Sequence, residues 1–189
     1  MSENSAKPYL FKFWYRPGTV VRALLESRQG HHLALGCSSV FGALQALRFY
    51  LVDDRVSPII IIFGAVAGLL GLYLFSWLLR NFGRWFGARA KLPEMRVALG
   101  WGLLPWTVLF GIVALMVSRG EDAEMLTSLA PILFVGFVYG YALILLSIAA
   151  ALRLSALKAF LCLIVTCVVS IFPLTLTAQF VTHAFGLTP

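Results

Sequence analysis

The chain has 189 residues, of which 60% are hydrophobic and 12% are charged. A soluble domain carries about 25% charged residues, so this chain has too few charges to cover a water-facing surface. The apolar excess is expected to face lipid, and the length allows five membrane-crossing helices of about 20 residues each. The composition therefore excludes an ordinary soluble domain and predicts an all-α polytopic membrane protein.

The formal net charge is +7, and such an excess of basic residues can also indicate nucleic-acid binding. The basic residues occur in short clusters between apolar runs, as topology signals do in membrane proteins. We therefore expect no nucleic-acid partner.

Residues 1–31 precede the first long apolar run and are expected to form a cytoplasmic amino-terminal segment. Aromatic residues surround Lys12, a composition that favours the headgroup layer of a membrane. From Pro17 onward, apolar and charged side chains separate onto two faces at helical spacing. We predict a short interfacial amphipathic helix over 17–27 that lies on the membrane surface. The same pattern also suits an amphipathic turn packed on other loops.

Five apolar runs follow, and each is predicted to be a transmembrane helix. They cover residues 32–51, 59–79, 97–117, 129–152 and 159–180. The first run is the least apolar because it contains Gln45 and Arg48. Pro105 should kink the third, since its ring removes one backbone hydrogen bond and crowds the preceding turn. Residues 32–183 are thus expected to form one transmembrane domain, followed by an external tail over 184–189.

The basic residues fall unequally on the two sides of such a bundle. Twelve of the 15 lie on the side of the amino terminus: Lys7, Lys12, Arg16, Arg22, Arg28, Arg80, Arg84, Arg89, Lys91, Arg96, Arg153 and Lys158. Lys and Arg collect on the cytoplasmic side of membranes, so the amino terminus is expected to be cytoplasmic and the carboxyl terminus external. This layout requires an odd number of spans, and five satisfies it.

The segment 15–27, YRPGTVVRALLES, resembles the opening motif of the bacterial branch of the Yip1 family. Residues 68–106 resemble that branch's middle region: GLLGLYLFSWLLR, GRWFG, a basic turn and RVALGWGLLP. The resemblance implies a five-span integral membrane protein with a cytoplasmic amino terminus, here in the bacterial cytoplasmic (inner) membrane. For eukaryotic members it would imply binding of small Rab-type GTPases and a part in vesicle traffic. Their long cytosolic amino-terminal segment has only a short counterpart here, so that partner is not carried over.

Two glycine pairs at GxxxG spacing lie in the second and fourth predicted spans. They are Gly64 with Gly68 and Gly136 with Gly140. Glycine lets two helix backbones approach closely and gain dispersion contacts. We predict that these faces pack against helices of the same or another subunit; ordinary glycine usage in membrane helices is the alternative.

Four polar residues lie towards the external ends of the first and last spans: Gln45, Arg48, Gln179 and His183. Polar groups at membrane depth are costly and often mark a pathway or a binding pocket. One hypothesis is a shared polar pocket. The alternative is that Arg48 extends to the interface and His183 is already in water.

Five basic residues flank the connection after the second span: Arg80, Arg84, Arg89, Lys91 and Arg96. A basic residue near the surface attracts anionic headgroups by about 1 kcal/mol. We predict contact with membrane lipids through anionic headgroups on the inner side. A topology signal with incidental lipid contact is the alternative.

The sequence contains no recognisable catalytic, cofactor or metal motif. His31 and His32 would point about 100° apart on a helix, and the three cysteines lack CxxC spacing. No aspartate or glutamate lies within a predicted span to relay protons. The predicted function is non-enzymatic: a scaffold, adaptor or accessory subunit that contacts other membrane protein subunits or itself. A transporter or channel component for a small solute is the alternative.

Overall fold

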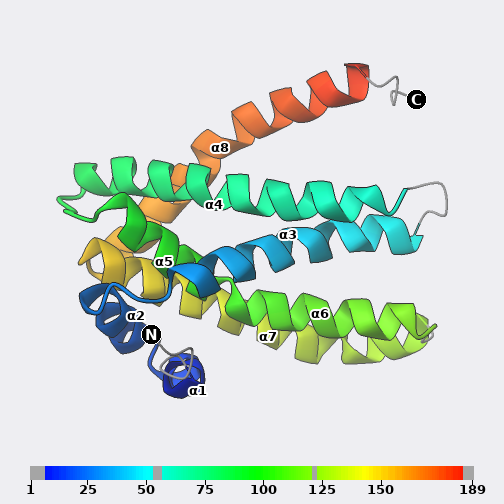
Figure 1. Cartoon of the computed structure of the whole chain (residues 1–189), viewed down its shortest axis with the longest axis horizontal. Coiled ribbons are helices and arrows are strands. Elements are labelled where there is room, and N and C mark those ends of the chain that lie inside the picture. The colour runs from blue at the N-terminus through cyan, green and yellow to red at the C-terminus, as the bar shows by residue number, and fades with distance from the viewer. Residues whose placement is uncertain (1–6, 53–56, 121–122, 185–189) are drawn as a thin grey trace.

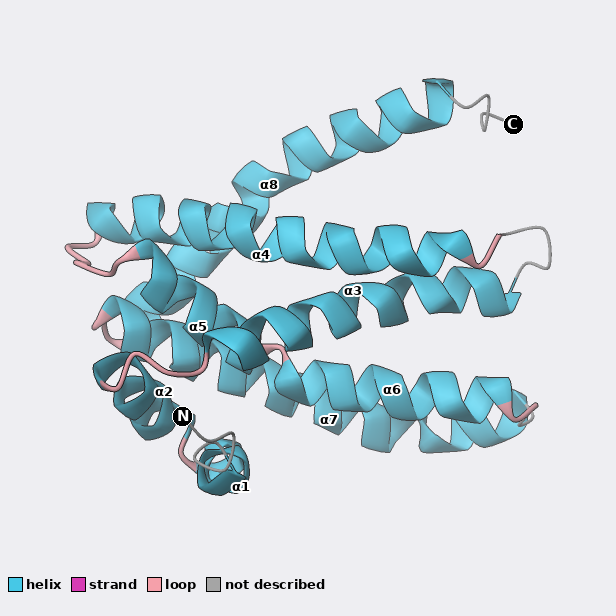
Figure 2. Ribbon diagram, in the orientation of Figure 1, coloured by secondary structure: helices cyan, strands magenta, loops and turns pink. Residues whose placement is uncertain are grey.

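The structure is a computed structural model that describes residues 7–52, 57–120 and 123–184. All regular structure in these residues is α-helical (Figure 1; Figure 2), which confirms the predicted fold class. The helices are α1 (Lys7–Tyr15), α2 (Pro17–Glu26), α3 (His31–Val52), α4 (Ile59–Trp85), α5 (Leu92–Gly102), α6 (Leu104–Ser118), α7 (Ala123–Leu152) and α8 (Ala156–Ala184). Residues 185–189 of the predicted external tail lie outside the described residues.

Within the described residues, three helical stretches are long and apolar enough to cross a membrane. They are Ile59–Trp85, Leu92–Ser118 and Thr127–Leu152, at the second, third and fourth predicted spans. A shorter apolar helix, Ala156–Ile171, forms the first part of α8. α3 covers the first predicted span but is not among the three, and its polar residues explain its lower apolarity. The chain is thus a helical membrane protein, and the count of five crossings stays a prediction.

The long helices lie side by side, with one exception. Figure 1 shows α3, α4, α6 and α7 running along the long axis of the molecule, while the second half of α8 diverges from α4. The first half of α8 is held more firmly: Ala159 and Cys162 are fully buried, and the Cys162 thiol donates to the Leu79 carbonyl oxygen at 3.5 Å. The divergence leaves one side of α3 and α4 without a covering helix.

α3 and α4 approach each other through small residues. A Cβ built on Gly64 would lie 2.6 Å from the Gly42 carbonyl oxygen, and one on Gly68 would overlap the Ser38 carbonyl oxygen. Ala46 faces Gly64 one turn further along α3. Neither glycine of α4 can carry a side chain here, because the backbone of α3 occupies the space.

The third predicted span, in which Pro105 was expected to produce a kink, is divided into two helices. α5 ends at Gly102 and α6 begins at Leu104, with Leu103 between them. Pro105 occupies the first turn of α6, where a missing N–H costs least. The Leu103 carbonyl oxygen accepts from both the Thr107 N–H at 2.8 Å and the Thr107 hydroxyl at 3.0 Å. The Leu103 N–H in turn donates to the Leu99 carbonyl oxygen at 2.9 Å, so α5 and α6 follow each other as one apolar stretch, Leu92–Ser118.

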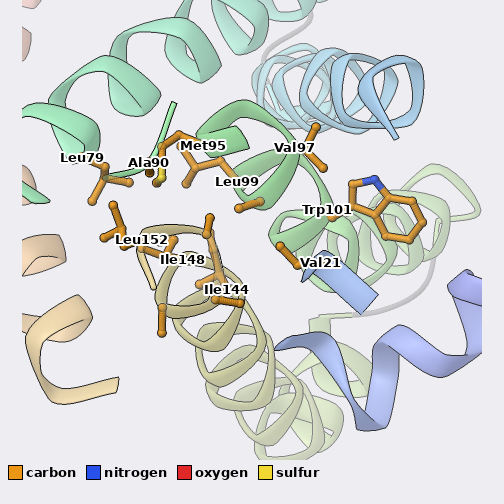
Figure 3. Close-up of a cluster of buried hydrophobic side chains, with 14 of the residues drawn as sticks. Val21, Leu79, Ala90, Met95, Val97, Leu99, Trp101, Ile144, Ile148 and Leu152 are labelled. Carbon is orange, nitrogen blue, oxygen red and sulfur yellow. The ribbon is translucent and has the colours of Figure 1, made fainter. Parts of the chain in front are cut away.

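The buried core surrounds α5 (Figure 3). Met95 and Trp101 of α5 have no exposed surface, and Ile148 and Leu152 of α7 are equally buried. α2 contributes Val21 from a third direction (Figure 3). Packing within the protein is therefore densest at the end of the bundle that carries α2 and α5.

The opposite halves of α4, α6 and α7 expose large apolar side chains. They include Ile62, Phe63, Ile112, Leu115, Phe134 and Val135. Exposing such an apolar surface to water is unfavourable, whereas exposing it to the hydrocarbon of a membrane is not. These faces are the ones expected to contact lipid.

α2 matches the predicted amphipathic helix over 17–27 closely in extent. Val20, Val21 and Leu24 are at most 1% exposed, because α2 packs against α5 and α7. The apolar face that the sequence places in the headgroup layer is thus covered by protein.

α1 is a helix that the sequence pattern did not predict. Figure 1 shows it end-on, across the direction of the long helices. Its Phe13 is completely buried, with its ring centroid 5.7 Å from that of Trp101. Phe11 and Tyr15 point the other way and are 82% and 69% exposed. The exposed aromatic side chains of the amino-terminal segment therefore belong to α1 and not to α2.

We expect the substitution Gly68→Leu to lower the free energy of unfolding in detergent by about 3 kcal/mol, because overpacking a tight contact is destabilising. Gly36→Leu on the outer side of α3 is the control, since nothing lies within 4 Å of a Cβ at that position. Thermal unfolding of both variants measures the difference. Equal stability of the two proteins would contradict a tight α3–α4 contact.

The substitution Phe13→Ala should cost about 3 kcal/mol of folding free energy, because it empties a buried aromatic site. Phe11→Ala removes the same atoms from an exposed position of the same helix and should leave stability nearly unchanged. Thermal unfolding again distinguishes the two. A larger effect at Phe11 would mean that α1 packs through its other face.

Candidate functional site

An apolar groove opens on the side of the bundle where α8 diverges. It has a volume of about 650 Å³ and is lined by residues of the six helices α3 to α8 and by Leu103 at the α5–α6 junction. Most lining side chains are aliphatic or aromatic, including Phe41, Phe49, Phe63 and Phe75. The groove is therefore a lateral, lipid-compatible surface.

The floor of the groove is built of small residues. They are Gly42 and Ala46 from α3, and Gly64, Ala67, Gly68 and Gly71 from α4. The Gly64 and Gly68 pair was predicted from its spacing, but its partners on α3 were not. Ser38, Gly42 and Ala46 repeat every four residues, and this small-residue spacing is the signal that could have revealed them.

Gly71 differs from the other glycines of the groove. A Cβ on Gly71 would meet nothing within 4 Å, so its place is open space in the groove. A side chain at this position can occupy the groove without disturbing the α3–α4 contact. Gly71 is thus the position at which access to the groove can be changed while the fold is kept.

The second glycine pair packs against α6. A Cβ on Gly140 would overlap the Trp106 indole, and one on Gly136 would lie 3.2 Å from Leu109 Cδ1. The Trp106 Nε1–H donates to the Phe137 carbonyl oxygen at 3.2 Å, and its ring stacks on the Phe137 ring at 5.1 Å between centroids. This pair therefore supports an internal contact between α6 and α7.

Of the three predicted pocket residues whose side chains the structure describes, Gln45 alone lines the groove. Gln45 lines it, but Arg48 is exposed and lies 4.8 Å from the ring centroid of Phe49. Gln179 is exposed on the diverging half of α8 and does not line the groove. The side chain of His183 lies outside the described residues. The polar pocket stays a hypothesis, with Gln45 as its one member in the groove.

The five predicted headgroup contacts differ in burial. Arg84, Arg89 and Lys91 are exposed, whereas Arg80 of α4 and Arg96 of α5 are half-buried. The Arg96 guanidinium lies 4.7 Å from the ring centroid of Tyr73 on α4. The backbone N–H of Lys91 donates to the Glu94 carboxylate at 2.7 Å, which fixes the start of α5. These five residues, the basic rim, thus comprise three exposed side chains and two half-buried ones.

His31, the first residue of α3, lies close to this rim. Burial lowers the pKa of His31, and the charges of Arg96 and His32 lower it further. The charge of Arg96 therefore acts on His31 at the start of α3.

In the part of the chain that the structure describes, no three His, Cys, Asp or Glu side chains are placed to hold a metal ion. The three cysteines are free thiols, of which Cys162 is buried and Cys167 lies at the groove. The features available for chemistry are thus the apolar groove and the half-buried arginines.

Comparison with known proteins gives one positive result. A family model described as the Yip1 domain matches residues 11–177, from α1 into α8. No curated protein and no solved structure gives a significant match. Because the matched residues cover far more than half of the chain and include both the groove and the basic rim, the chain belongs to the Yip1 family.

Proposed function

We propose that this Yip1-family membrane protein acts without catalysis, as a scaffold, adaptor or accessory subunit of a larger membrane assembly. The groove between α3, α4 and α8 is the observation that carries the proposal. Its occupant is a transmembrane helix of a different membrane protein subunit. The membrane is the bacterial cytoplasmic one, with the amino terminus cytoplasmic and the carboxyl terminus external.

The lining of the groove favours a helix over a polar solute. Its walls are aliphatic and aromatic, and Gln45, Tyr141 and Cys167 are its polar side chains. A charged or strongly polar solute would lose its hydration there with little replacement. Gly71, whose Cβ position is open, and the exposed Ala67 instead leave room for a further helix to approach α4, and small residues are how membrane helices associate.

The distribution of charge supports the proposed orientation. Figure 1 places α2, the α4–α5 connection and the α7–α8 connection at the same end of the molecule. These segments carry most of the basic residues that the charge count assigns to the cytoplasmic side. Arg119, after α6, lies at the other end. The basic segments thus lie together at one end of the molecule, which supports the proposed orientation.

Site-specific photo-crosslinking in native membranes tests the proposed helix contact. A photoreactive residue at Phe63, in the groove, should capture a discrete protein through one of its transmembrane segments. The same residue at Val66, which is exposed on α4 but does not line the groove, is the position control. Capture of lipid alone, or of a second copy of this chain, would contradict an accessory-subunit role.

The substitution Gly71→Leu should abolish that capture, because its side chain fills the groove from an open position. Gly36→Leu adds the same side chain outside the groove and should leave capture unchanged. Thermal unfolding should show both variants as stable as the unmodified protein. Undiminished capture by a folded Gly71→Leu protein would place the partner elsewhere.

A further inference from the structure

Three buried polar atoms lack a hydrogen-bond partner among the described residues, and all three lie on α4 or α5. They are the Ser76 hydroxyl oxygen, the Arg80 Nε and the Arg96 Nε. An unsatisfied buried donor costs free energy, and a charged one costs more. Three such groups on two packed helices call for a partner such as water, an ion or a ligand.

Ser76 is unusual among the buried hydroxyls of the described residues. Four others donate to the carbonyl oxygen one turn earlier, at 2.7–2.9 Å: Ser38, Ser147, Thr166 and Ser170. Ser76 is 0% exposed but makes no such bond. Its hydroxyl is therefore a donor that no described residue uses.

The two arginines reach this region from different helices. Arg80 follows Ser76 by one turn of α4, which places both on one face of that helix. Arg96 extends from α5 to α4, where its guanidinium contacts the Tyr73 ring, one turn before Ser76. Tyr73, Ser76 and Arg80 thus form one strip of α4, and Arg96 closes it from the side.

We propose that Arg80 and Arg96 bind a phosphate group between α4 and α5, with the Ser76 hydroxyl as a further donor. A guanidinium presents a planar set of donors that matches the oxygens of a phosphate, including its Nε–H. The site lies at the basic end of the bundle, beside the exposed Trp77 that suits a headgroup layer. The phosphate belongs to a lipid headgroup or to a soluble phosphate ester.

This site is narrower than the predicted basic rim. Arg84, Arg89 and Lys91 are exposed and attract anions through solvent, whereas the Nε atoms of Arg80 and Arg96 are buried without a partner among the described residues, so a ligand in contact would satisfy them. The proposal is independent of the groove, so either can fail without the other.

The test is a titration of the full chain, purified in uncharged detergent, with thermal stabilisation as the readout. The probes are phosphatidylglycerol, inorganic phosphate, and oleate as an anionic lipid without phosphate. Phosphatidylglycerol should stabilise the protein more than oleate at equal charge. Additional stabilisation by inorganic phosphate alone would identify a soluble phosphate ester as the source. Failure of both phosphate probes would overturn the site.

The variants Arg80→Gln and Arg96→Gln should each weaken the apparent affinity for the effective probe about tenfold, through loss of charged hydrogen bonds. Arg84→Gln and Arg89→Gln remove the same charge at exposed positions and should leave the affinity nearly unchanged. Equal weakening by all four variants would show diffuse attraction and overturn the site.

Arg80→Lys and Ser76→Ala keep the proposal testable if the glutamine variants do not fold. Lysine keeps the positive charge but lacks the Nε–H and the planar arrangement of donors. Both variants should weaken phosphate binding while leaving the response to oleate unchanged. Unchanged phosphate binding in both would overturn the site.

Discussion

Close approach of α3 and α4 is the contact on which the rest of the structure depends. Lipid gives no hydrophobic reward for bringing two apolar helices together, so association relies on dispersion and on how near the backbones can come. Gly42, Gly64 and Gly68 remove the side chains that would hold the backbones apart. The same small residues form the floor of the groove, so the contact that holds the pair together also shapes its open side.

The molecule has two ends of different character. Around α5, core packing ties α2, α4 and α7 together, and the basic segments gather there. Towards the other end, α4, α6 and α7 expose apolar side chains to their surroundings. The described residues thus form a tightly packed cationic end and an end whose apolar side chains face the surroundings.

Much of the fold follows from the sequence, because helices in lipid are read from long apolar runs. The runs locate α3 to α8, Pro105 locates the division near Leu103, and Pro17 locates the start of α2. α1 was missed because its nine residues, KPYLFKFWY, have too few polar positions to show a helical period. The apolar face of α2 is covered by α5 and α7, and a local sequence pattern does not show which other helices pack against it.

The candidate sites were less predictable, since they depend on which faces meet. Spacing identified Gly64 and Gly68 but not Ser38 and Ala46, whose side chains hide the small-residue period of α3. Composition identified five basic residues as one group. Only the position of α5 against α4 separates the half-buried Arg80 and Arg96 from their exposed neighbours.

The division at Leu103 has a mechanical consequence. α5 is fixed in the core, whereas α6 contacts its surroundings through Val108, Ile112 and Leu115. Helices answer a change in hydrocarbon thickness by tilting, and an interrupted hydrogen-bond ladder is where such a tilt is easiest. In a thinner bilayer α6 can therefore tilt relative to α5, while α5 and the core around it keep their geometry.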